Sequence, residues 1–157
     1  MEREDVCYTR ETALQKAIEM ESKSFETYKD AYGKVKDPRA KRVVKELALD
    51  ELEHRYLLEK AFFEETIALH DADLKEGPSM NLSIILEERP LDADSTDQDV
   101  MIHAIHEEKR AIEFYKSMAR ECGDAPMEGM FKKLHQDEER HLASLEELYE
   151  SIYMQEM

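Results

Sequence analysis

The chain has 157 residues, 41% of them hydrophobic, so it is long enough for one domain with a buried core. Only four glycines and four prolines occur, which favours long helices over a sheet with many turns. The formal net charge of -16 repels phosphate backbones and anionic membrane surfaces. We therefore expect a single all-α domain over residues 1–157 that binds neither nucleic acid nor membranes.

Cysteine usage and the first residues bear on the compartment. Cys7 and Cys122 are the only cysteines, too few for a disulfide framework, and no CxxC pair occurs. The chain begins without the apolar stretch of a signal peptide, and no run approaches the roughly 20 apolar residues of a membrane span. We expect a cytoplasmic protein.

A first helical hairpin is expected over about 9–70. Apolar residues recur every three or four positions from about residue 9 to 33, which is the period of an amphipathic helix. Asp37 and Pro38 then start a second helix, because aspartate is a common N-cap and proline is favoured at the first helical position. The apolar stripe of this second helix predicts that it continues to about His70.

The next segment, about 71–94, connects the hairpins. It is broken by Gly77, Pro78 and Pro90. Neighbouring antiparallel helices need only about 2 to 8 connecting residues. A connection this long predicts a crossover along the whole bundle, and a mobile lid is the alternative.

A second helical hairpin is expected over about 95–154. Ser95 or Thr96 would cap its first helix, which ends near Gly123. Asp124 and Pro126 then start the last helix, so that the two hairpins have matching turns.

The two hairpins repeat one set of residue types with an offset of 87. The first copy is Glu21, Tyr28, Glu51 and His54, and the second is Glu108, Tyr115, Glu138 and His141. The same register also pairs Asp50 with Asp137. Chance does not readily place a glutamate, a tyrosine and a Glu-x-x-His pair in one register twice, so this constellation is the candidate functional site.

The four repeated glutamates occupy positions where core residues are expected. Glu21 fills a gap in the apolar stripe of the first helix, and Glu108 fills the same gap in the third. Unpaired charges buried in a bundle would cost several kcal/mol each. Since no Lys or Arg lies on these stripes beside the glutamates, we expect two bound metal ions to neutralise them.

The spacing brings the six candidate ligands to one level. Each Glu-x-x-His pair projects from one helix face, and every one of the four glutamates lies 15 residues from the turn of its hairpin. Oxygen-rich ligation with one imidazole per metal suits iron or manganese better than zinc. A glutamate from each of two helices with Glu-x-x-His from each of the others is the known pattern of di-iron and di-manganese bundles.

Two tyrosines accompany these ligands. Tyr28 and Tyr115 each follow a candidate glutamate ligand by seven residues and are nearly in line with it two turns away. We expect their hydroxyls to approach the cluster from the side, and plain core positions are the alternative.

These motifs resemble the ferritin-like superfamily, and within it the rubrerythrin-like di-iron carboxylate proteins. The resemblance is carried by AIEMESKSFETY (17–28), DELEH (50–54), AIHEEKRAIEFY (104–115) and DEERH (137–141). It covers nearly the whole chain. It implies a ferritin-like four-helix bundle made of two repeated antiparallel helical hairpins joined by a long crossover.

The resemblance also implies residue roles. A pair of iron ions, with manganese possible, would react with hydrogen peroxide or dioxygen. The bridging ligands would be Glu51 and Glu138, the terminal carboxylates Glu21 and Glu108, and the imidazole ligands His54 and His141. Tyr28 and Tyr115 would donate hydrogen bonds to ligand carboxylates and so fix their geometry.

The sequence departs from the rubrerythrin pattern in two places. Rubrerythrins carry another glutamate three residues beyond the third-helix ligand, where this chain has Ala111. The equivalent position in the first hairpin is Ser24, so neither hairpin has a glutamate there. The sequence also shows no Cys-rich rubredoxin domain. We therefore expect an external electron donor, such as a rubredoxin-type protein. We also expect a homodimer or higher homo-oligomer.

Three functions are compatible with these features. The leading hypothesis is an oxidoreductase of the peroxidase or ferroxidase type that reduces peroxide or dioxygen. The first alternative is an iron or manganese binding or storage protein without turnover. The second is a metal-free structural bundle whose glutamates are protonated.

The remaining histidines and the glutamates beside the ligands are not assigned to the site. His70, His103, His106 and His135 are expected at surface or cap positions. Glu53, Glu107 and Glu139 are expected to be solvated.

Overall fold

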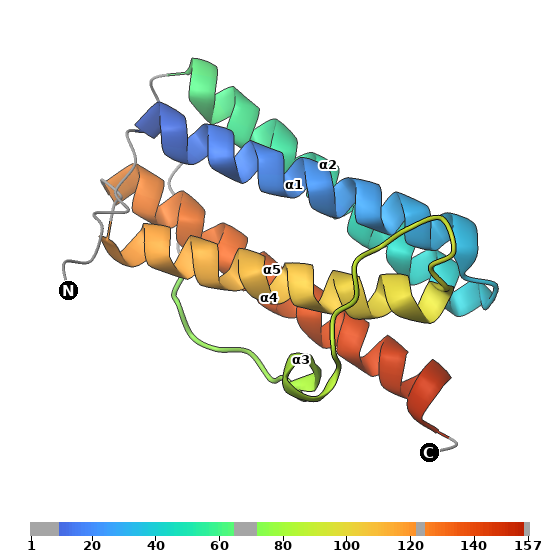
Figure 1. The fold of residues 1–157 in the computed structure, drawn as a ribbon. Helices are drawn as coiled ribbons and strands as arrows, with labels where there is room; N and C mark the ends of the chain where they lie inside the picture. Colours follow the sequence, from blue (N-terminus) through green and yellow to red (C-terminus); the bar gives the residue numbers. More distant parts are fainter. Residues whose placement is uncertain (1–9, 65–71, 122–124, 156–157) are drawn as a thin grey trace.

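The computed structural model describes residues 10–64, 72–121 and 125–155, in which every regular element is a helix. The elements are α1 (Arg10–Lys34), α2 (Pro38–Phe63), α3 (Leu82–Ile85), α4 (Asp97–Glu121), α5 (Ala125–Tyr149) and the π-helical turn η1 (Glu150–Met154). In Figure 1, α1 lies beside α2 and α4 beside α5, and α3 lies in the connection between the pairs. The predicted all-α helical bundle is confirmed.

The α1–α2 turn uses the predicted cap. Asp37 Oδ1 accepts hydrogen bonds from the backbone N–H groups of Arg39 (2.8 Å) and Ala40 (3.0 Å). These are two of the N–H groups that a helix start leaves without a partner. Pro38, the first helical residue, has no N–H to satisfy.

The prediction that α2 continues to about His70 is wrong, because the helix ends at Phe63. Glu64 has extended backbone angles, φ -101° and ψ 139°. Arg10 donates to the carbonyl oxygens of Ala61 (2.7 Å) and Glu64 (2.8 Å). A cation at the last carbonyls stabilises a helix end, and this contact comes from the start of α1, far away in the sequence.

The connection between α2 and α4 runs along the bundle as a crossover and is fixed at several points (Figure 1). Glu146 on α5, which is 1% exposed, accepts hydrogen bonds from Ser79 Oγ (2.8 Å), Met80 N (3.1 Å) and Leu82 N (2.9 Å). Further along, Arg110 on α4 forms two hydrogen bonds with Glu88. These contacts favour a docked connection over a mobile lid.

The second hairpin starts at the expected position. Thr96 Oγ1 accepts from Asp99 N (3.1 Å), and Asp99 Oδ2 accepts from Thr96 N (3.0 Å), which is a capping box. The predicted turn at Asp124 lies outside the described residues. At its other end α5 passes into η1, so the helix stops close to the predicted residue 154.

Two apolar clusters form the core, one on each side of a polar layer. One cluster includes Val44, Ile105 and Leu145, and the other includes Leu14, Leu58 and Phe131. All of these side chains are fully buried. The polar residues between them are therefore shielded from solvent along the bundle axis.

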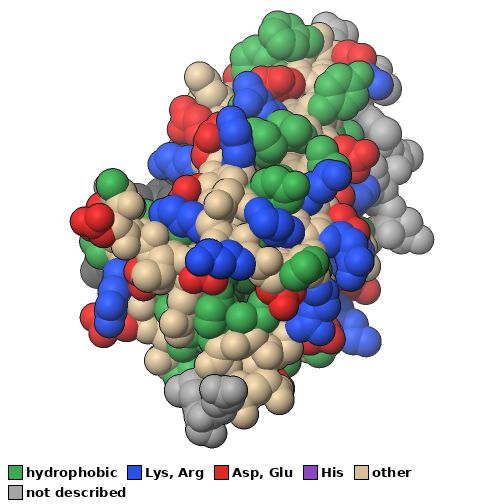
Figure 2. All heavy atoms as spheres, turned by 90° about the vertical axis from the view of Figure 1, so that its right-hand side faces the viewer, with side chains coloured by type: hydrophobic (Ala, Val, Ile, Leu, Met, Phe, Trp, Pro, Cys, Tyr) green, Lys and Arg blue, Asp and Glu red, His purple; other side chains and the backbone are tan. Residues whose placement is uncertain are grey.

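Charge is unevenly distributed over the surface. Residues 34–45 around the α1–α2 turn contain six Lys or Arg and one Asp, in a chain of net charge -16. Figure 2, which views the side that lies to the right in Figure 1, shows many basic side chains there. Within the part of the chain that the structure describes, no helix is apolar and long enough to cross a membrane.

Candidate metal centre

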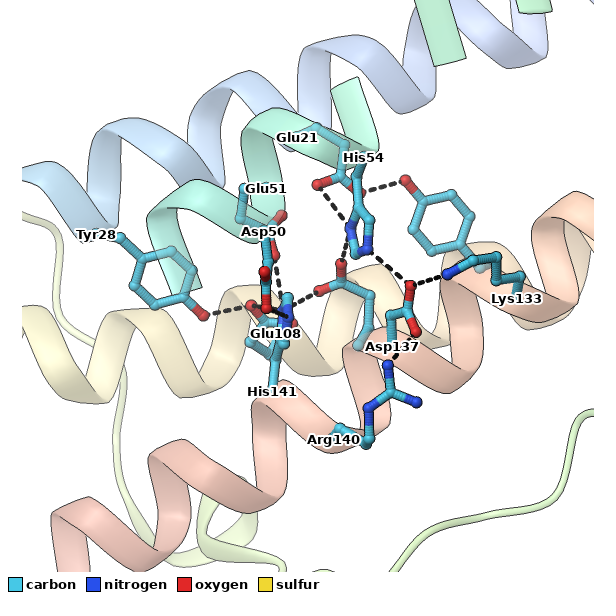
Figure 3. A network of polar contacts seen from close by, with 12 residues as sticks. Glu21, Tyr28, Asp50, Glu51, His54, Glu108, Lys133, Asp137, Arg140 and His141 are labelled. Atoms are coloured by element: carbon cyan, nitrogen blue, oxygen red, sulfur yellow. Dashed lines mark hydrogen bonds and ion pairs between the residues drawn. The ribbon is translucent and has the colours of Figure 1, made fainter. Parts of the chain in front are cut away.

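The polar layer contains all six predicted ligands. Glu21 comes from α1, Glu51 and His54 from α2, Glu108 from α4, and Glu138 and His141 from α5. None of these residues is more than 6% exposed. Figure 3 labels five of them, all except Glu138, and shows their side chains pointing toward one another between the helices. Helical spacing places each at the level where a core residue would otherwise lie.

The six side chains form two overlapping groups, and in each group one ligand atom per residue lies within 4.8 Å of the others. The groups are Glu21, Glu51, His54 and Glu138, and Glu51, Glu108, Glu138 and His141. Glu51 and Glu138 belong to both. Two candidate metal positions that share two carboxylates match the bridging and terminal roles that the resemblance implies, and these roles remain predictions.

The donor atoms fit a metal ion because they are buried and face one another without an ordinary hydrogen bond. Both carboxylate oxygens of Glu138, one oxygen of each other glutamate in the groups, and Nδ1 of each histidine are buried without a hydrogen bond. Buried polar atoms are nearly always hydrogen-bonded, so a set of unpaired atoms facing one point requires an explanation. Buried Glu and His side chains arranged in this way fit a metal site.

The orientation of the histidines identifies their metal-facing atoms. His54 Nδ1 lies 2.9 Å from Glu138 Oε1, and His141 Nδ1 lies 2.8 Å from Glu51 Oε1. The two rings stack with their centroids 5.6 Å apart. Each Nε2 points the opposite way, to Asp137 or Asp50. Nδ1 is therefore the atom available to a metal.

Both tyrosines hydrogen-bond to candidate ligands of the other hairpin. Tyr28 donates to Glu108, and Tyr115 donates to Glu21 at 2.5 Å. Burial, with added repulsion from the same glutamates, raises the pKa of both hydroxyls well above the usual value. Each tyrosine therefore remains a donor and holds one carboxylate in place.

Without metal, protons distribute the charge in this centre. Burial raises the pKa of Glu51 and Glu108, and repulsion from Glu138 adds to the effect. Burial alone would lower the pKa of His54, but the hydrogen bond to Asp137 and the close contacts with Glu138 and Glu21 outweigh this effect and raise the pKa to about 12. The pKa of His141 is raised for the same kind of reason.

Glu138 differs from the other glutamates. Burial would raise its pKa, but close contacts with Glu108, His141 and His54 hold the pKa well below the usual value. These shifts favour an ionised Glu138 between two protonated imidazole rings when no metal is bound. The expectation that only metal ions can neutralise the carboxylates was too strict, because the two histidines can supply positive charge.

Some of the residues that were not assigned to the site are buried, although they were expected at the surface. His70 lies outside the described residues. The expectation that His135 is a surface or cap residue is wrong, since it is 0% exposed, and Glu139 is buried at 8%. Glu139 lies under the crossover, where a Cβ on Gly77 would be 3.5 Å from its side chain. The helical period of the sequence identifies the face of α5 that packs inside the bundle, but it does not show that the crossover covers the face that carries Glu139.

Sequence reasoning left three important carboxylates unassigned. Asp50 and Asp137 contact the histidines, and Glu146 holds the crossover. The offset of 87 pairs Asp50 with Asp137 and so provided a signal for both. Nothing in the helical period distinguishes Glu146 from a solvated glutamate.

The comparisons with known proteins agree with this geometry. The rubrerythrin family matches residues 12–149. A solved structure of a two-domain protein from Anabaena variabilis, with DJ-1/ThiJ/PfpI-like and ferritin-like domains, is similar with a TM-score of 0.65 and 17% identity. The similarity covers 93% of this chain and 38% of that one, and it shows a ferritin-like fold. None of the curated proteins compared with this chain matches it. With the family match spanning both hairpins and all six residues of the centre, the chain belongs to the rubrerythrin family.

Proposed function

We propose that this protein is a di-iron oxidoreductase that reduces hydrogen peroxide or dioxygen with electrons from an external donor. The observation that carries the proposal is the pair of overlapping ligand groups, each with three carboxylates and one imidazole. Glu51 and Glu138 would hold both metal ions. The membership in the rubrerythrin family supports iron over other metals.

The two iron ions, when bound and ferrous, would supply one electron each, so that peroxide, two electrons and two protons yield two water molecules. The protein's own contribution is to hold the carboxylates in position. Tyr28 fixes Glu108 and Tyr115 fixes Glu21 through their hydrogen bonds. The apolar clusters above and below keep bulk water away from the centre.

We expect a small oxidant to approach from the α1–α4 side. A cleft of about 350 Å³ between these helices is lined by Ser24 and Ala111, both with short side chains. Each lies one helical turn beyond a candidate ligand, Glu21 or Glu108. Ala111 therefore leaves space where other rubrerythrins carry a further glutamate.

The external donor is expected to carry negative charge. The basic residues 34–45 include Arg39, which lines a cleft of about 370 Å³ that also reaches His141. A donor attracted to this end would come close to the metal centre.

The decisive experiment is steady-state peroxidase activity of the iron-loaded protein with a reduced rubredoxin as donor. Turnover with both peroxide and donor consumed supports the proposal. Iron-loaded ferrous protein that stays ferrous after peroxide addition contradicts it. Loading with zinc, which does not change oxidation state, is the matched control and should give no turnover.

Metal binding is expected to release protons and to weaken as the pH falls. The folded pKa of His54, about 12, exceeds its unfolded value of about 6.5, so its protonated form stabilises the metal-free protein. The contribution of protonated His54 to the free energy of unfolding is fully present below about pH 6.5 and is lost as the pH rises through the folded pKa. A metal ligand must be deprotonated, so metal and protons compete.

Calorimetric titration with Mn²⁺ in two buffers of different ionisation enthalpy measures the released protons. We expect more than one proton per chain at pH 7, and a lower affinity at pH 6 than at pH 8. An affinity that is constant across this range would contradict the protonated imidazoles.

A further inference from the structure

The histidines of the centre are each held by an aspartate of the other hairpin. His54 Nε2 lies 3.0 Å from Asp137 Oδ2, and His141 Nε2 lies 3.2 Å from Asp50 Oδ2. With Nδ1 facing the metal position, Nε2–H donates to the aspartate. Such a partner fixes the ring orientation of a metal-binding histidine.

These two aspartates differ strongly in their surroundings. The side chain of Asp137 is 8% exposed, and it accepts from Lys133 Nζ at 2.7 Å and from Arg140 (Figure 3). The side chain of Asp50 is 52% exposed. Over the stretches of chain that the structure describes, no Lys or Arg forms an ion pair with Asp50. Asp137 is therefore fixed, whereas Asp50 is free to exchange its contact with His141 for water.

The sequence repeat shows the origin of this difference. The offset of 87 relates the candidate ligands of the two hairpins. It also pairs Lys133 with Glu46 and Arg140 with Glu53. Asp137 thus has a cation one turn away on either side, and Asp50 has an anion at each corresponding position. The ligands of the two hairpins match, but the charges beside their aspartates are opposite.

The Asp50–His141 pair is also more accessible to solvent than the Asp137–His54 pair. A cleft of about 370 Å³ is lined by Asp50 and His141 but by neither Asp137 nor His54. A second cleft, of about 390 Å³, touches both pairs. The Asp50–His141 pair is therefore open on two sides.

We propose that the two metal positions are inequivalent, with the His54 position holding its metal tightly and the His141 position exchanging it, because Asp137 is a fixed positioning residue and Asp50 is not. This inference rests on the proposed metal function. Loss of a hydrogen-bonding partner of a metal ligand typically costs 10- to 100-fold in affinity. An exposed partner contributes less, since solvent screens it and replaces it.

The cations beside Asp137 do not reverse this order. Lys133 is 37% exposed and Arg140 is 67% exposed, so solvent and salt screen their repulsion of a bound metal. The hydrogen bond that they hold in place is buried. Its orientation of His54 is therefore the larger effect.

Titration of the metal-free protein with Mn²⁺ tests the inference, with Asp137→Asn and Asp50→Asn as a matched pair. Free Mn²⁺ is measured by electron paramagnetic resonance. We expect the wild type to bind two Mn²⁺ per chain in two steps. Asp137→Asn should weaken the tighter step about 10- to 100-fold, whereas Asp50→Asn should change either step less than about 3-fold. At one Mn²⁺ per chain, anomalous diffraction should locate the ion in the His54 group.

A charge reversal beside Asp137 distinguishes a loss of histidine orientation from a folding defect. Lys133→Glu with Arg140→Glu gives Asp137 the neighbours of Asp50 and should weaken the tighter step, although every ligand and both aspartates remain. Equal losses in the two Asn variants, or a first ion in the His141 group, would overturn the inference while leaving the metal function intact. A wild-type chain that binds no Mn²⁺ would overturn both.

Discussion

Glu138→Gln is expected to abolish binding of both metal ions. Glu138 belongs to both ligand groups, is 0% exposed, and has two carboxylate oxygens without a hydrogen bond. The substitution keeps the volume of the side chain and removes its charge, so packing in the layer is preserved while both positions lose a ligand. In the wild type, free metal at about 100 times Kd stabilises the native state by about 2.7 kcal/mol.

That stabilisation corresponds to a rise in Tm of about 5 to 10 °C for a chain of this size. We expect the rise on adding Mn²⁺ to disappear in Glu138→Gln and to persist in Glu147→Gln. Glu147 is an exposed residue of the same helix and serves as the matched control. Circular dichroism of both metal-free variants checks that the helices form. A full Tm rise in Glu138→Gln would show that this carboxylate is not a shared ligand.

Glu146→Ala is expected to lower the free energy of unfolding by about 3 kcal/mol, even without metal. The carboxylate is buried and accepts three hydrogen bonds from the crossover, two of them from backbone N–H groups. Hydrogen bonds to a charged group contribute about 1.5 to 3 kcal/mol, and donors left without a partner add a penalty. Part of the crossover can become hydrated in the variant, which limits the total cost.

Urea unfolding of the metal-free protein measures this effect. Ser79→Ala removes one of the three donors and should cost only about 1 kcal/mol, and Glu147→Ala should be nearly neutral. Mn²⁺ stoichiometry should remain at the wild-type value in Glu146→Ala, because Glu146 is in neither ligand group. A loss below about 1 kcal/mol would mean that the crossover is not fixed by this residue.

The sequence supported a detailed prediction of the helices and of the residues in the centre. The caps at Asp37 and Thr96 depend on hydrogen bonds within three residues, so local sequence is sufficient to locate them. Glu21 and Glu108 interrupt apolar stripes whose period already specifies the inward face. The repeat then indicated that the two hairpins contribute to one site, because a single offset of 87 relates all of the candidate ligands.

Long-range contacts decided where these predictions failed. Arg10 contacts the end of α2 from the start of α1. The helical period did not indicate that His135 and Glu139 are buried. Glu146 is buried because Ser79 to Leu82 lie against it. None of these pairs is close in sequence. The crossover covers Glu139 and Glu146 on α5, whereas the contact of Arg10 with Ala61 joins the start of α1 to the end of α2.

The amino-acid sequence by itself determined the helical class, the repeated hairpins and the six inward-facing candidate ligands, since helical period and residue spacing are properties of the linear chain. Only the tertiary structure decided the protonation of the metal-free centre and the difference between Asp50 and Asp137. Both depend on the distance between charges and on their exposure to water, and these are defined only when helices from the two hairpins pack together.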